Sequence, residues 1–171
     1  MKKGKRSPAV RCAYYGILVA LAMILSYVEV LIPIPIGIPG IKLGLANLVV
    51  FTALYLMDAR AAFVISMVRI LLVSMTFGNS FALLYSFSGG LLSYAAMAVC
   101  KKLDLLSPVG VSITGGVTHN FAQLVVASFV LENRMVFTYF PVLLLAGTVT
   151  GALIGIVGSQ CMKRLSKWSI N

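Results

Sequence analysis

Long apolar runs, separated by short breaks, constrain this chain more than any other feature of its sequence. A helix needs about 20 apolar residues to cross the hydrocarbon core of a bilayer. Only 11% of the residues are charged, against about 25% in a soluble domain, so there is too little polar surface to cover a water-soluble globule. We therefore predict an all-α integral membrane bundle that forms one transmembrane domain over residues 1–171, with about six helices at 13–32, 41–57, 59–76, 81–99, 108–131 and 141–162.

The breaks between the runs contain residues that end or start helices. Residues 33–40 hold three prolines and two glycines, which a continuous helix does not tolerate. Asp58 stands directly before the third run and is expected to cap that helix. Ser107 followed by Pro108 is typical of a helix start, with serine as the N-cap and proline in the first turn.

The basic residues predict the orientation of the bundle. Cytoplasmic loops of membrane proteins carry an excess of lysine and arginine, and the net charge of +10 is distributed in that way rather than as a basic stripe for nucleic acid. The prediction is a multi-pass protein of the cell (plasma) membrane, with lipids as neighbours, no nucleic-acid partner and both termini in the cytoplasm. One side would carry 11 basic residues, namely Lys2, Lys3, Lys5, Arg6, Arg11, Arg60, Lys101, Lys102, Lys163, Arg164 and Lys167, and the other would carry Lys42 and Arg134.

The first apolar run follows a basic N-terminus, as in a signal peptide, but it is longer than the 7–15 residues typical of such a segment. We therefore expect it to be an uncleaved membrane helix. The three cysteines, Cys12, Cys100 and Cys161, show no close pairing and predict neither a disulfide framework nor a metal site.

Small residues recur on two of the predicted helices. Gly147, Gly151 and Gly155 lie on one face of the last helix, where small side chains let another helix backbone approach closely in lipid. We favour packing inside the bundle for this face, with self-association as the alternative. Gly16 and Ala20 form a weaker version on the first helix, whose small face could instead dock a partner subunit.

Few strongly polar side chains lie within the predicted membrane helices, so each of them is informative. A charged residue at the centre of a membrane helix costs roughly 2.5–3.5 kcal/mol on insertion scales, and such residues usually face a protein interior or a wet cavity. All of these residues are predicted between the midplane and the outer end, which suggests a pocket open to the outside and closed below. The pocket would take a small ligand with an anionic group and an apolar body, bound through Glu29, Lys42, Asn47, Arg69, His119, Asn120 and Gln123.

Each of these residues also has a purely structural interpretation. Arg69 and Glu29 could form an ion pair that holds the first and third helices together, because buried charges usually pair. Lys42 could extend its side chain to the outer headgroups. His119 could be a neutral, hydrogen-bonded residue of the core, although three polar residues within five positions of one helix favour a functional role.

The sequence contains no pattern for catalysis. It lacks the glycine-rich loop with which ATPases bind phosphate. Its four acidic residues do not cluster, so they form no Asp-rich motif for Mg²⁺ on a diphosphate, and its single histidine excludes a histidine-rich metal site. We expect no enzymatic activity in this chain alone, no cofactor and no metal.

Three stretches carry a resemblance to a known family: GIKLGLANL, RILLVSMTFGNSFALLYSFSGGLLS and GGVTHNFAQL. With them, the chain from about residue 12 to residue 164 resembles the Gx transporter family, which is also named heptaprenyl diphosphate synthase component I. That family is similar to the substrate-binding S components of energy-coupling factor transporters, which are six-helix membrane proteins that capture micronutrients at the outer face.

The resemblance implies a function and a set of partners. S components work with two ATPases and a transmembrane coupling subunit, which small residues on their first helix contact; Ala13, Gly16 and Ala20 match that position by type and spacing. The expected function is thus a substrate-binding subunit of an importer for a small anionic or amphipathic micronutrient. The alternatives are a non-catalytic membrane component of a prenyl diphosphate, quinone or redox pathway, and an autonomous transporter that self-associates through the last helix.

Overall fold

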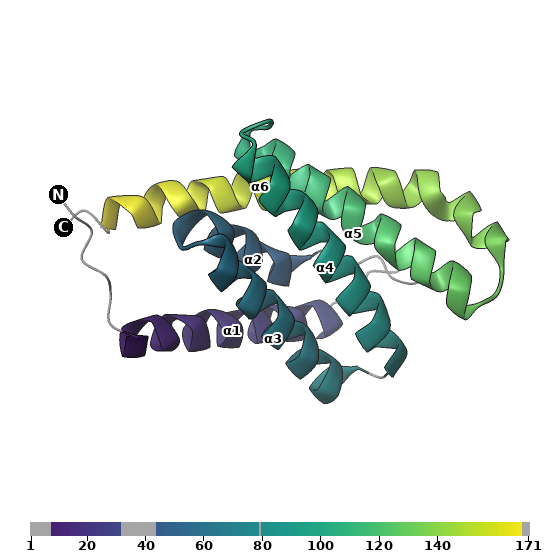
Figure 1. Cartoon of the computed structure of the whole chain (residues 1–171), viewed down its shortest axis with the longest axis horizontal. Helices are drawn as coiled ribbons and strands as arrows, with labels where there is room; N and C mark the ends of the chain where they lie inside the picture. Colours follow the sequence, from purple (N-terminus) through teal and green to yellow (C-terminus); the bar gives the residue numbers. More distant parts are fainter. Residues whose placement is uncertain (1–7, 32–43, 79, 169–171) are drawn as a thin grey trace.

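The computed structural model describes residues 8–31, 44–78 and 80–168, and all regular structure in these ranges is helical. The expected all-α class is therefore confirmed. Six α-helices and one short 3₁₀ helix follow one another (Figure 1): α1 (Pro8–Leu31), α2 (Leu45–Leu56), α3 (Ala59–Phe77), α4 (Ser80–Lys102), α5 (Pro108–Val130), η1 (Arg134–Tyr139) and α6 (Phe140–Trp168).

The helix ends follow local chemistry. The Asp58 carboxylate accepts a hydrogen bond from the Ala61 backbone nitrogen at 2.7 Å, and the Ser107 hydroxyl accepts one from Gly110 at 3.2 Å, so both expected N-caps are confirmed. Helix α1 begins at Pro8, earlier than expected, because proline is tolerated in a first helical turn. Helix α6 continues to Trp168, since its basic last turns are as compatible with a helix as the apolar ones.

In the part of the chain that the structure describes, four helical segments are long and apolar enough to cross a membrane, in α1, α3, α4 and the stretch from η1 into α6. Helix α5 has the length, with 23 residues, but its polar residues lower its hydropathy. Helix α2 has only 12 residues, or about 18 Å of helix, whereas the sequence predicted a helix over 41–57. It begins at Leu45 because Gly44 has a left-handed backbone with φ of 73°, and residues 41–43 lie outside the described part.

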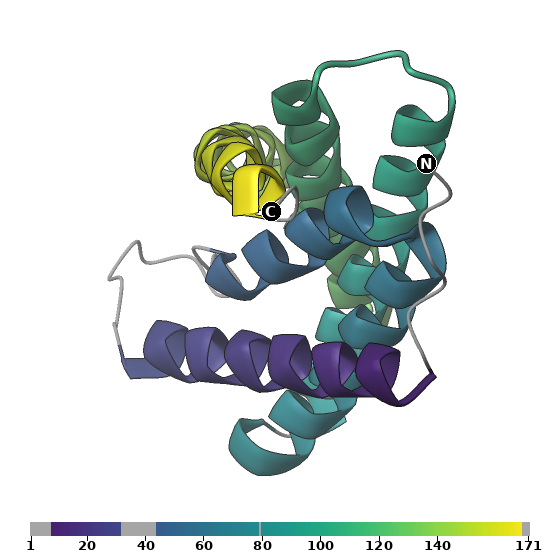
Figure 2. The same ribbon diagram turned by 90° about the vertical axis from the view of Figure 1, so that its left-hand side faces the viewer.

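The helices form a closed ring in which neighbours in space are not always neighbours in sequence. In the order α1, α2, α6, α5, α4 and α3, each helix packs against the next, and α3 packs against α1. Figure 2 looks nearly along α6, whereas α1 crosses the same view lengthwise, so these two helices are strongly inclined to each other. Helix α2 lies between them and connects the two halves of the ring.

Glycines allow α5 and α6 to pack backbone against backbone. A Cβ atom on Gly147 would lie 2.8 Å from the Gly116 carbonyl oxygen, and one on Gly151 would lie 2.7 Å from the Ile113 Cα atom. Real Cβ atoms do not approach this closely, so only glycine permits the contact. The small face of α6 therefore packs inside the bundle, as expected, and α5 occupies the surface that the self-association alternative requires.

One end of the ring, which we call the basic end, contains the start of α1, the turn between α2 and α3 and the end of α4. Arg11 forms an ion pair with Asp58 at 3.1 Å, and the Lys101 ammonium donates to the Leu54 carbonyl oxygen. The Tyr94 hydroxyl donates to the Ala59 carbonyl oxygen at 2.7 Å. These contacts tie α1 and α4 to the α2–α3 turn and place Arg11 and Lys101 at the same end of the ring.

Candidate functional site

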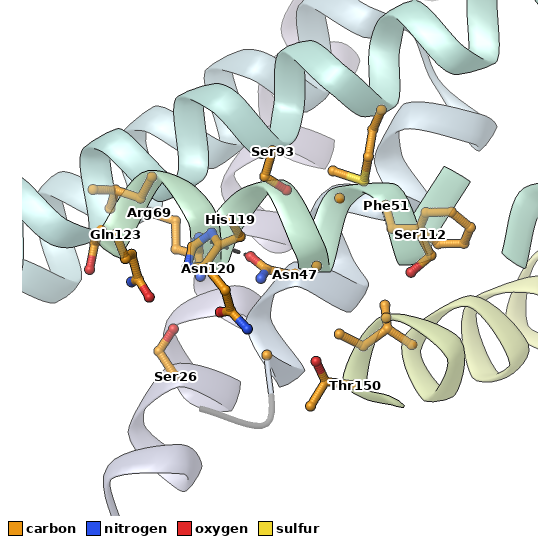
Figure 3. Close-up of a pocket in the computed structure, with 18 of the residues that line it drawn as sticks. Ser26, Asn47, Phe51, Arg69, Ser93, Ser112, His119, Asn120, Gln123 and Thr150 are labelled. Atoms are coloured by element: carbon orange, nitrogen blue, oxygen red, sulfur yellow. Dashed lines mark hydrogen bonds between the residues drawn. The ribbon is translucent and has the colours of Figure 1, made fainter. Parts of the chain in front are cut away.

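A cavity of about 140 Å³ lies in the centre of the ring, and all six α-helices contribute to its wall. Figure 3 shows the side chains that surround it. Six of the seven predicted binding residues line the cavity, namely Glu29, Asn47, Arg69, His119, Asn120 and Gln123. The seventh, Lys42, lies outside the described residues.

The cavity has two chemically different ends. Arg69, His119, Asn120 and Gln123 gather on one side in Figure 3, while Phe51 and Ser112 lie at the other. Beyond Phe51 towards the basic end, the buried residues form a cluster that contains only apolar side chains. The cluster consists of Ala22, Val49, Val50, Phe51, Ala53, Leu54, Ala62, Ile65, Met97 and Val111, and it closes the cavity on that side.

Glu29 stabilises the start of α2. One of its carboxylate oxygens accepts hydrogen bonds from the backbone nitrogens of Gly44 and Leu45, the latter at 3.1 Å. The first N–H groups of a helix have no partner within the helix and carry a partial positive charge, so a carboxylate from a neighbouring helix satisfies both needs. Within the described residues Glu29 and Arg69 form no direct salt bridge, although the charge of Glu29 still acts on Arg69 from a distance.

Arg69 projects from the middle of α3 into the cavity. One terminal nitrogen donates to the Asn47 amide oxygen at 3.2 Å, which joins α3 to the first turn of α2. The Nε atom is shielded from solvent and has no hydrogen-bond partner. The half-buried guanidinium donates to one neutral amide, which compensates a charge only in part, so it is left with donors to offer to a ligand.

The polar residues of α5 line the cavity, and His119 and Gln123, four positions apart, lie on one face of the helix. Gly89 on α4 makes room for the imidazole of His119, since a Cβ atom there would lie 2.8 Å from the ring. The Asn120 amide nitrogen donates to the Leu143 carbonyl oxygen on α6 at 2.8 Å. Asn120 therefore has a structural contact as well as a place on the cavity wall, while Gln123 lies further along the same face.

Most of the hydroxyl groups on the cavity wall were not anticipated from the sequence. Serine and threonine are common in membrane helices, where their hydroxyls usually bond to a carbonyl one turn earlier, as Ser26 does with Ala22 at 2.9 Å. Such residues carry no pattern that distinguishes a cavity wall from a helix interior. The hydroxyl side chains that line the cavity are Ser26, Ser74, Ser86, Ser93, Ser112 and Thr150.

The small face of α1 lies on the outside of the ring. Ala13, Gly16 and Ala20 are all exposed, and a Cβ atom on Gly16 would meet no other atom within 4 Å. This face is therefore open to lipid or to a partner. The structure separates the two predicted sets, with the binding residues inside the ring and the partner-binding residues outside it.

Among the described residues, no group of three or more histidine, cysteine, aspartate or glutamate side chains is placed to hold a metal ion. The fold and the cavity together define a helical integral membrane protein with a small polar site enclosed by its helices. Residues 18–161 match the model of a protein family, and the chain belongs to that family, heptaprenyl diphosphate synthase component I. No curated protein and no solved structure matches this chain.

Proposed function

We propose that this protein is the substrate-binding subunit of an importer of the energy-coupling factor type. It would bind a small anionic or amphipathic micronutrient at the outer face and depend on separate ATPase and transmembrane coupling subunits. The observation that carries the proposal is the cavity, in which a shielded Arg69 with a spare donor lies above an apolar cluster that closes one side.

The shape of the site supports capture rather than a continuous channel. The polar side chains lie around the cavity, and the contacts of Lys101, Asp58 and Tyr94 join three helices below the apolar cluster. Passage through the chain would require this packing to open. An energy source outside the chain is consistent with the lack of a nucleotide-binding loop in the sequence.

The exposed small face of α1 suggests where the coupling subunit binds. Ala13, Gly16 and Ala20 leave the α1 backbone accessible over more than one turn, and helices in lipid pack most closely where both present small residues.

The test is gentle purification of the tagged protein from its native membrane, followed by mass spectrometry of the proteins that accompany it. Recovery of an ATPase pair and a membrane coupling protein would support the proposal. Ala20→Leu should abolish that recovery by covering the small face. Ala95→Leu, the same change at an exposed position of α4, is the matched control and should leave recovery unchanged.

A second function is favoured by the family name, which refers to synthesis of a long prenyl diphosphate. In that case the chain would be a non-catalytic membrane component of a prenyl diphosphate, quinone or redox pathway. Recovery of prenyl synthase or redox proteins without an ATPase, unaffected by Ala20→Leu, would support this function and count against the importer.

A further inference from the structure

The charges on the cavity wall indicate what kind of ligand it can hold. Apart from His119, the ionisable side chains among the described lining residues are Glu29 and Arg69. The Glu29 carboxylate is engaged by two N–H groups at the start of α2, whose partial positive charge it offsets. Arg69 donates only to the neutral Asn47 amide and forms no direct salt bridge among the described residues, so Glu29 offsets its positive charge only from a distance.

We propose that the cavity binds a ligand with a single carboxylate and an apolar body about the size of one aromatic ring. The proposal rests on the proposed function, because it names the class of substrate that the site would capture. The carboxylate lies against Arg69, and the body extends towards Phe51 and the apolar cluster.

The geometry of arginine favours a carboxylate at this place. Its planar guanidinium can donate two parallel hydrogen bonds to the two oxygens of one carboxylate. The Nε atom of Arg69 has no partner, so it is available as one of the two donors. The Asn47 contact holds the guanidinium in place, which reduces the entropy that binding would otherwise cost.

The charge count argues against a diphosphate. A diphosphate carries at least two negative charges, and proteins usually hold it with several basic side chains, with helix N-termini or with Mg²⁺. The described wall offers one arginine, and its one helix N-terminus is already occupied by Glu29. The described residues also provide no acidic cluster for a metal ion.

The size of the cavity argues in the same direction. An engineered apolar cavity of about 150 Å³ is filled by one benzene molecule, and the volume here is about 140 Å³. A single ring therefore matches this volume, whereas a prenyl chain of many isoprene units would extend well beyond it. Ser112 and Thr150 add hydroxyl groups along the wall, which allow a ring that carries a polar substituent.

The experiment measures retention of radiolabelled benzoate by the purified full chain in lipid nanodiscs. Unlabelled benzoate, benzamide and geranyl diphosphate serve as competitors. Benzamide has the shape of benzoate without its charge, so it reports the contribution of the charge alone. A hydrogen bond to a charged group is worth enough for benzamide to compete at least about tenfold more weakly than benzoate.

Three variants assign the effect to Arg69. Arg69→Gln should lose benzoate binding by about tenfold or more, and Arg69→Lys should retain part of it because the charge remains. Arg60→Gln makes the same change at an exposed position of the same helix and should bind like the unmodified chain. The benzoate and benzamide comparison in the unmodified protein needs no variant to fold.

Saturable benzoate binding that depends on Arg69 and is preferred over benzamide would support the proposal. Equal competition by benzamide, displacement mainly by geranyl diphosphate, or no saturable benzoate binding would each overturn it. The result is independent of the partner purification, because Arg69 lies inside the ring and Ala20 outside it. Benzoate selectivity without an ATPase partner would leave a carboxylate site in a protein that is not an importer subunit.

Discussion

Replacing Glu29 by glutamine separates the two roles that this residue could have. The variant keeps an oxygen that can accept from the Gly44 and Leu45 nitrogens but removes the negative charge. Hydrogen bonds to charged groups contribute about 1.5–3 kcal/mol and neutral ones about 0.5–1.5 kcal/mol. With two such bonds at a helix start, we expect Glu29→Gln to lower the free energy of unfolding by about 2 kcal/mol.

The free energy of unfolding of Arg69 variants shows whether the charges of Glu29 and Arg69 stabilise each other. In the absence of ligand, Arg69→Gln should leave stability unchanged or raise it, since it removes a charge with little compensation. In a double-mutant cycle, the coupling energy between Glu29 and Arg69 should remain below about 1 kcal/mol, because Glu29 bonds to backbone N–H groups instead. Breaking a buried ion pair would cost about 3–5 kcal/mol.

The assay is reversible unfolding in mixed micelles with an increasing fraction of sodium dodecyl sulfate, followed by far-ultraviolet circular dichroism. Glu132→Gln is the matched control, because Glu132 is exposed and a surface change of this kind falls within about 0.5 kcal/mol. A coupling energy above about 2 kcal/mol would refute the assignment of Glu29 to α2. An unchanged stability of Glu29→Gln would refute it as well.

Other substitutions test the packing of the ring by the same unfolding assay. Gly151→Ala places a Cβ atom 2.7 Å from the Ile113 Cα atom and should destabilise the protein by about 1–3 kcal/mol, whereas Gly16→Ala, in open space, should be neutral or stabilise it by up to about 1 kcal/mol. Similar effects of the two changes would contradict the α5–α6 contact. Asp58→Ala should cost about 1 kcal/mol or more by removing the cap on Ala61, and Asp58→Asn, which keeps the cap and loses an exposed ion pair, should cost less than about 1 kcal/mol.

The predictable parts of the fold are those that depend on local chemistry. The apolar runs predicted about six helices, and the described residues form six α-helices. The Asp58 and Ser107 caps follow from side chains that bond to backbone nitrogens within one turn. The face of α5 that carries His119 and Gln123 follows from helical spacing alone. The start of α2 was not predictable, because it depends on a carboxylate from another helix and on the backbone of Gly44.

The lining of the cavity could largely be predicted from the sequence, but the contacts among its residues could not. Strongly polar side chains are rare in membrane helices and usually face the interior of the bundle or a wet cavity. Six of the seven predicted residues accordingly line one cavity. Sequence alone could not decide between Glu29 and Asn47 as the neighbour of Arg69, since the choice depends on how α2 sits between α1 and α3. Most serines on the wall were missed, because a serine hydroxyl bonds to a carbonyl one turn earlier whether it faces a cavity or a neighbouring helix.

The brevity of α2 has a consequence for how the protein is made. A segment of 12 residues is too short to be recognised as a separate span when the chain leaves the ribosome and enters the bilayer. It is followed by α3 after a two-residue turn, Met57 and Asp58, so the two helices form a hairpin that can insert as one unit. The depth of α2, and with it the position of Asn47, is then decided by its neighbours after insertion rather than by its own partitioning into lipid.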